Sequence, residues 1–156
     1  MTAERLLSYF SEKRFITDLR ARTKDGVLTE MARTLADDEG AGDPTLLLEM
    51  IRRRESLGST GLGKGVAVPH GRSTASTDTR VVFALSAKGV DFGALDEEPC
   101  RLFFLIVAPY EDRRHEYLPL LGKIVEVVSE DAVREKLLSV DSFSSFAEII
   151  REALSE

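Results

Sequence analysis

Apolar residues recur along the chain with two different spacings, and the change between them predicts an α/β fold. Runs in which apolar residues alternate with polar ones or stand together predict strands at 14–19, 66–68, 80–87 and 101–108. Segments with apolar residues every three or four positions predict helices at 24–36, 44–55, 113–129, 131–139 and 142–154. The run at 101–108 is almost entirely apolar, so we expect that strand to be central and covered on both faces.

The helix at 44–55 has a recognisable beginning. Asp43 supplies a carboxylate that can accept from the free N–H groups of the first turn, and Pro44 has the backbone angle that this turn requires. A polar, glycine-punctuated break at 37–42 separates this helix from the preceding one.

Composition narrows the class of protein. The chain has 156 residues, 43% hydrophobic and 31% charged, which predicts one globular domain over 1–156. One cysteine and two histidines allow no internal disulfide and no Cys/His zinc site, and we expect no metal or other cofactor. The net charge of −6 gives no argument for nucleic-acid binding. No apolar run approaches the roughly 18 residues of a membrane span, and the start lacks a signal-peptide pattern, so we expect a cytoplasmic protein without membrane insertion.

The stretch from 58 to 65 contains the glycines Gly58, Gly61, Gly63 and Gly65. Such a stretch can form a loop that aims several backbone N–H groups at one anion. Part of it fits a nucleotide P-loop, but Gly65 stands where Ser or Thr must hold Mg²⁺. The predicted order of helix, loop and strand also differs from a P-loop, so a nucleotide-binding protein is a remote alternative.

His70 is the candidate nucleophile. It follows a short predicted strand and stands between Pro69, whose backbone is stiff, and Gly71, which removes side-chain bulk. An unperturbed histidine has a pKa near 6.5 and is mostly neutral at pH 7, as a nucleophile requires. From this spacing alone, a structural histidine is the competing interpretation.

Arg54 is the candidate partner of His70. It belongs to the run Arg52-Arg53-Arg54, of which at least one member is expected to face solvent on the helix. Arg54 itself lies at the end of the helix, just before the glycines, where its planar guanidinium can bind an anion in bidentate fashion. Histidine, arginine and backbone amides together favour phosphoryl transfer through a phosphohistidine.

The run Arg54-Glu55-x-x-x-Ser59-Thr60-Gly61-Leu62-Gly63-x-Gly65-x-Ala67-x-Pro69-His70 closely resembles the signature of type-2 enzyme IIA domains. These domains belong to the fructose/mannitol and nitrogen-regulatory branch of the bacterial phosphoenolpyruvate-dependent phosphotransferase system. The resemblance implies a three-layer α/β/α sandwich around a small mixed β-sheet. It also implies that His70 accepts phosphate on Nε2 from HPr or a similar carrier, that Arg54 attends the phosphoryl group, and that an enzyme IIB domain or a regulated target receives it.

Two questions stay open at this point. The chain as given carries no fused IIB or IIC domain, which favours a nitrogen-regulatory protein, with a sugar-transport IIA component as the alternative. Many family members have a second histidine at the start of a later helix, where this chain places Tyr117, with His115 two residues earlier. Either residue can support His70, or the role is absent. Cys100 is expected to be buried, and 96–98 to be solvated surface.

Overall fold

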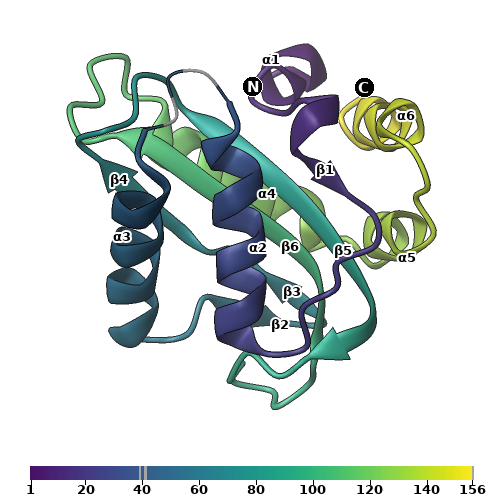
Figure 1. Ribbon diagram of the computed structural model, residues 1–156. Coiled ribbons are helices and arrows are strands. Elements are labelled where there is room, and N and C mark those ends of the chain that lie inside the picture. Colours follow the sequence, from purple (N-terminus) through teal and green to yellow (C-terminus); the bar gives the residue numbers. More distant parts are fainter. Residues whose placement is uncertain (39, 41, 156) are drawn as a thin grey trace.

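The computed structural model of the chain describes residues 1–38, 40 and 42–155. Six strands form one mixed sheet in the order β1-β5-β6-β3-β2, with β4 pairing to β6 beside that path (Figure 1). The strands are β1 (Phe15–Ile16), β2 (Gly61–Gly63), β3 (Val66–Ala67), β4 (His70–Ser73), β5 (Arg80–Val90) and β6 (Cys100–Pro109).

Strand β6 positions the segment that carries His70. It runs antiparallel to β5 along most of its length, and on its other side it pairs in parallel first with β3 and then with β4. Val66 lies opposite Leu102, and His70 lies opposite Ile106. Strands β3 and β4 therefore follow one another along the same side of β6, and Pro69 separates them.

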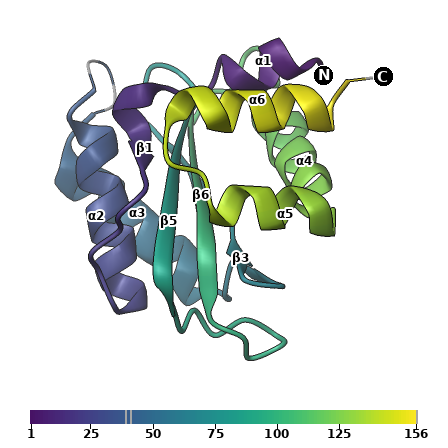
Figure 2. The same ribbon diagram turned by 90° about the vertical axis from the view of Figure 1, so that its right-hand side faces the viewer.

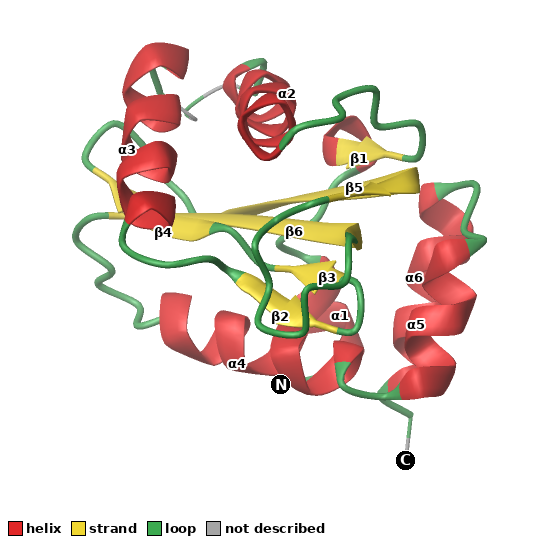
Figure 3. Cartoon of the chain, turned by 90° about the horizontal axis from the view of Figure 1, so that it is seen from below, coloured by secondary structure: helices red, strands yellow, loops and turns green. Residues whose placement is uncertain are grey.

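Helices cover both faces of the sheet. They are α1 (Ala3–Leu7), α2 (Lys24–Ala36), α3 (Pro44–Ser56), α4 (Tyr117–Val128), α5 (Asp131–Leu138) and α6 (Phe143–Ala153). Figures 2 and 3 show α2 and α3 on one face and α4, α5 and α6 on the other, with α1 beside α6. The predicted three-layer α/β/α sandwich with a mixed sheet is confirmed.

Alternate residues of the central strands supply two separate cores, as the period of two in a strand requires. In β5, Val81 and Phe83 pack towards α4, α5 and α6, whereas Val82 and Ala84 pack towards α2 and α3. Strand β6 divides in the same way, and its residues 102–108 are buried throughout. The expectation of a central strand covered on both faces is confirmed.

Several element boundaries differ from the sequence-based expectations. The helix at 24–36 agrees, and the expected strand at 14–19 is reduced to β1 behind a short 3-10 turn (Glu12–Arg14). The helix expected at 113–129 begins only at Tyr117. Helix α1 and strand β4 were not predicted, because five and four residues are too few to show a period. Parts of the expected break at 37–42 lie outside the described residues.

The glycine-rich stretch forms a hairpin where its composition predicts a loop. From Gly61 onward it forms an antiparallel hairpin of β2 and β3. Lys64 and Gly65 make its turn with φ angles of 57° and 80°, the left-handed region that such tight turns need. Asp96 accepts the amide of Lys64 at 2.7 Å, so the exposed acidic loop holds the hairpin tip.

Two smaller expectations are also resolved. Cys100 is fully buried, and burial, the largest influence, raises the pKa of its thiol to about 11. None of the helices in the described part of the chain has the length and apolar character needed to cross a bilayer.

Candidate active site

Strand β4 presents His70 and Arg72 on one face and Gly71 on the other. A Cβ atom on Gly71 would come within 2.1 Å of Met50 Sδ, so this position faces α3 at close range. Because side chains alternate along a strand, His70 and Arg72 point away from α3 and towards the start of α4. The alternation places both side chains beside Tyr117.

The backbone fixes the tautomer of His70. Its Nδ1 lies 2.7 Å from the carbonyl oxygen of Val68. A carbonyl can only accept, so Nδ1 carries the proton and Nε2 keeps its lone pair. Burial, the largest influence, lowers the pKa of His70, and the positive charge of Arg54 lowers it further. The hydrogen bond to Val68 and the negative charge of Glu55 raise it, but the net effect on the pKa is a decrease. The ring is therefore neutral at pH 7, with Nε2 available as a nucleophile.

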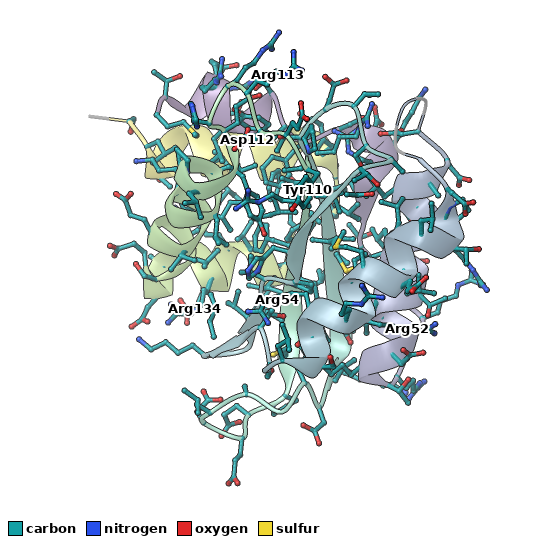
Figure 4. All side chains as sticks on the ribbon, turned by 90° about the vertical axis from the view of Figure 1, so that its left-hand side faces the viewer. Arg52, Arg54, Tyr110, Asp112, Arg113 and Arg134 are labelled. Atoms are coloured by element: carbon teal, nitrogen blue, oxygen red, sulfur yellow. The ribbon has the colours of Figure 1, made fainter. Side chains whose placement is uncertain are left out.

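Arg54 shares a cavity of about 550 Å³ with His70. It lies in the last turn of α3, and its Nη1 donates to the carbonyl oxygen of Gly58 at 3.0 Å. Of its two neighbours, Arg52 pairs with Asp25 at 2.7 Å outside this cavity, whereas Arg53 lines the cavity and pairs there with Glu49. Figure 4 shows Arg52 and Arg54 on different sides of α3.

Glu55, which sequence reasoning passed over as a functional residue, holds the segment after α3 in place. Its side chain is buried and accepts the amide of Thr60 at 2.8 Å and the Thr60 hydroxyl at 2.7 Å. Lys24 Nζ lies 2.8 Å from the same carboxylate and balances its charge. The carbonyl of Thr60 in turn accepts the amide of Val68, whose own carbonyl holds His70.

Tyr117, and not His115, lies against the candidate nucleophile. The ring centroids of Tyr117 and His70 are 6.1 Å apart, and Tyr117 is buried. The carboxylate of Asp112 accepts the amides of Glu116 and Tyr117 at 2.9 and 3.0 Å, which starts α4 at this residue. His115 is exposed, has a φ of 54° and is outside the cavity lining. The start of α4 thus brings a phenol to His70.

Arg72 is the site residue that sequence reasoning missed. Its guanidinium carbon lies 5.1 Å from the ring centroid of Tyr117, at cation–π distance. The period of two after His70 was the signal that could have found it, but the short strand β4 was itself unpredicted.

Part of the rim of the cavity is apolar and exposed. Leu46 and Leu57 of the α3 side are 51% and 82% exposed, and Tyr110 after β6 is 65% exposed. Exposed apolar side chains of this size around a polar centre are typical of a surface that meets another protein. Figure 4 places Arg54 and Tyr110 on the same side of the molecule.

The hairpin glycines make no part of this cavity. Among the described residues that line it, the only glycine is Gly71. The expected contribution of amides from 58–65 to anion binding finds no support in this lining and stays a prediction. The stretch also leads into β3 rather than into a helix, unlike a P-loop. Within the described residues, no three His, Cys, Asp or Glu side chains gather as a metal site requires.

The family model for the "Phosphoenolpyruvate-dependent sugar phosphotransferase system, EIIA 2" matches residues 8–153. The chain belongs to this family. The match covers the whole sheet and the cavity with His70, Arg54 and Tyr117, and it confirms the resemblance that the signature indicated.

Relatives in this enzyme IIA family carry two kinds of description. A fructose-specific EIIA component of Haloferax volcanii is 33% identical over 133 residues, 85% of each chain. A nitrogen regulatory protein of Pseudomonas aeruginosa is 33% identical over 147 residues, 94% of each chain. The match to both leaves transport and regulation as the two roles to separate.

Solved structures of the family share the fold. The nitrogen regulatory protein IIA-Ntr from Neisseria meningitidis superimposes with a TM-score of 0.83 at 30% identity, over 95% of this chain and 97% of that one. The mannitol IIA of Escherichia coli, in complex with phosphorylated enzyme IIB, superimposes with a TM-score of 0.76 at 23% identity, over 92% of this chain and 99% of that one. At this identity the comparison shows a similarity of fold alone.

Proposed function

We propose that this enzyme IIA protein is a phosphohistidine carrier, acting as one domain over 1–156, that accepts a phosphoryl group on His70. The single observation that carries the proposal is the bond from His70 Nδ1 to Val68, which leaves Nε2 unprotonated in a cavity shared with Arg54. A metal-free transfer between imidazoles needs positioning and charge neutralisation more than covalent machinery.

The transfer step is a displacement at phosphorus. The lone pair of His70 Nε2 attacks the phosphorus, the bond from phosphorus to the donor's imidazole nitrogen breaks, and its electron pair stays on that nitrogen. The proton on Nδ1 remains hydrogen-bonded to Val68, so no proton has to leave the site. Arg54 neutralises charge on the migrating group.

The donor we propose is an HPr-like phosphocarrier protein. The exposed apolar residues Leu46, Leu57 and Tyr110 around the cavity supply a contact surface of the kind a protein donor needs. The acceptor is an enzyme IIB, as in the mannitol complex, or a regulated target protein.

Of the two roles, we favour nitrogen regulation over sugar transport. IIA-Ntr of Neisseria meningitidis resembles the chain along nearly its full length, and so does the Pseudomonas nitrogen regulatory protein. Phosphorylation adds about −1.5 to −2 charges beside an apolar docking surface, which changes what can bind there. The alternative is a fructose-type transport component, the description carried by the Haloferax relative.

The decisive experiment uses enzyme I, HPr and labelled phosphoenolpyruvate with the wild type, His70→Gln and His115→Gln. The chain has two histidines, so the exposed His115 is a matched control. We expect acid-labile label on the wild type and on His115→Gln, and none on His70→Gln. Equal labelling of His70→Gln would refute the assignment, and labelling from ATP instead would revive nucleotide chemistry.

A second measurement separates the two roles. The phosphorylated protein is mixed with a fructose-type enzyme IIB, and loss of its label is followed against a buffer control. Slow loss, equal to that in buffer, supports regulation. Rapid transfer to IIB supports the transport alternative.

A further inference from the structure

Three arginines line the cavity of His70: Arg53, Arg54 and Arg72. Arg53 is paired with Glu49, and Arg54 donates one hydrogen bond to the carbonyl oxygen of Gly58. Arg72 is exposed at the cavity wall, and within the described part of the chain its guanidinium has neither a hydrogen bond nor an ion pair. Its guanidinium lies over the face of the Tyr117 ring.

The position of Arg72 is set by two elements. Strand β4 places it two residues after His70, on the same face of the strand. Tyr117, held by Asp112 at the start of α4, then lies beside both, with its ring 6.1 Å from the His70 ring and 5.1 Å from the Arg72 guanidinium. Stacking on a buried ring removes much of the rotational freedom that an exposed arginine otherwise has.

Arg54 and Arg72 approach the site from different elements. Arg54 comes from the end of α3, whereas Arg72 comes from β4 on the side of α4. Burial raises the pKa of Tyr117, while the positive charges of Arg72 and Arg54 both lower it. Both guanidinium groups are therefore close enough to the Tyr117 hydroxyl to favour negative charge there. A dianionic phosphoryl group on Nε2 offers three oxygens as hydrogen-bond acceptors. One planar guanidinium binds two of them in bidentate fashion, which leaves an oxygen for a second arginine.

We propose that Arg72 is a second phosphoryl-binding residue of this site, and that Tyr117 is the positioning residue that holds it beside His70. The proposal rests on the proposed function of His70. In the unphosphorylated protein the Arg72 guanidinium lies on the Tyr117 ring, and the carboxylate of Asp112 is a nearby negative charge. When the phosphoryl group arrives, the free N–H groups of Arg72 donate to its oxygens from β4, whereas Arg54 donates from the end of α3.

The test uses phosphoramidate, a small donor whose P–N bond breaks with release of ammonia, because it reports on the phosphoryl site without protein docking. Phosphorylation is followed by ³¹P NMR in the wild type, Arg72→Gln and Arg72→Lys. Arg113→Gln is the control, since it removes an exposed cation of the same charge that pairs with Glu111 outside the cavity.

We expect Arg72→Gln to accept phosphate about tenfold more slowly than the wild type, because a hydrogen bond to a charged group is lost. Arg72→Lys recovers part of the rate and Arg113→Gln keeps all of it. Tyr117→Leu slows the reaction too, adds little to Arg72→Gln in the double variant, and is rescued by Tyr117→Phe, which retains the ring. Thermal unfolding checks that each variant is folded.

The possible outcomes separate the two proposals. If the wild type takes no phosphate on His70, the proposed function fails. If the wild type is phosphorylated and Arg72→Gln matches Arg113→Gln with phosphoramidate, the inference about Arg72 alone is overturned. The inference about Arg72 is also overturned if Arg72→Gln is slow with HPr as donor but not with phosphoramidate. Arg72 would then contribute to the docking of HPr and not to binding of the phosphoryl group.

Discussion

The Nδ1 atom of His70 lies 2.7 Å from the carbonyl oxygen of Val68, two residues earlier in the chain. This contact joins a local backbone feature to the chemistry of the site, because it decides which ring nitrogen is free. It forms where Pro69 separates β3 from β4 along the side of β6.

We expect His70 to lose its proton at a pH below the ordinary range. Burial is the main reason that its pKa is lowered from 6.5, so the neutral, nucleophilic ring persists below that pH. An NMR titration of His115→Gln, in which His70 is the one remaining histidine, measures the value directly. A pKa at or above 6.5 would contradict the expectation.

The same shift predicts how stability depends on pH. Below 6.5 the unfolded chain binds the proton at this position more readily than the folded chain. The contribution of His70 to stability is therefore complete above 6.5 and is lost as the pH falls below it. Urea unfolding of the wild type and His70→Gln between pH 5 and 8 should show the difference shrinking in the acid range.

Arg54→Lys should slow phosphoryl transfer from HPr by about tenfold. Lysine keeps the charge but replaces a planar, bidentate donor with a point charge that cannot hold Gly58 and a phosphoryl oxygen in the same geometry. Stopped-flow or quench measurements of label transfer provide the rate. Arg52→Lys, on another side of the helix and paired with Asp25, is the control; equal rates in the two variants would remove Arg54 from the mechanism.

Glu55→Gln should destabilise the fold by about 2 kcal/mol. The buried carboxylate bonds to both the amide and the hydroxyl of Thr60 and pairs with Lys24, whose side chain is 30% exposed, so solvent screening reduces the loss. Urea denaturation measures the change. The exposed pair of Glu49 and Arg53 provides a contrast: Glu49→Gln should alter stability by about 0.5 kcal/mol or less.

Gly65→Ala should lower stability by about 1 kcal/mol without affecting phosphate uptake. The residue has a φ of 80°, which strains any side chain, but the hairpin makes no part of the cavity of His70. Thermal unfolding and phosphoramidate labelling measure the two effects. A fall in labelling at full folding would show that the hairpin does take part in anion binding.

Long periodic segments were predictable from the sequence because their signal repeats within the element. The helix at 24–36 and the apolar strand ending near 108 are examples. Strand β4 was not, since the four residues His70–Ser73 contain a glycine and an arginine and become a strand only through pairing with β6. The hairpin in the glycine stretch was not predicted either, because composition does not distinguish a hairpin turn from an anion-binding loop.

The sequence by itself determined the candidate chemistry of this protein: a histidine behind a proline, an arginine at a helix end and the signature that joins them are all local features of the chain. Only the tertiary structure decided what surrounds them. It brought Tyr117 rather than His115 to His70, placed Arg72 on the Tyr117 ring, and moved the glycines away from the cavity. These contacts join residues that are distant along the chain, and they depend on how β4 pairs with β6 and where α4 begins. A pattern of neighbouring residues does not contain that information.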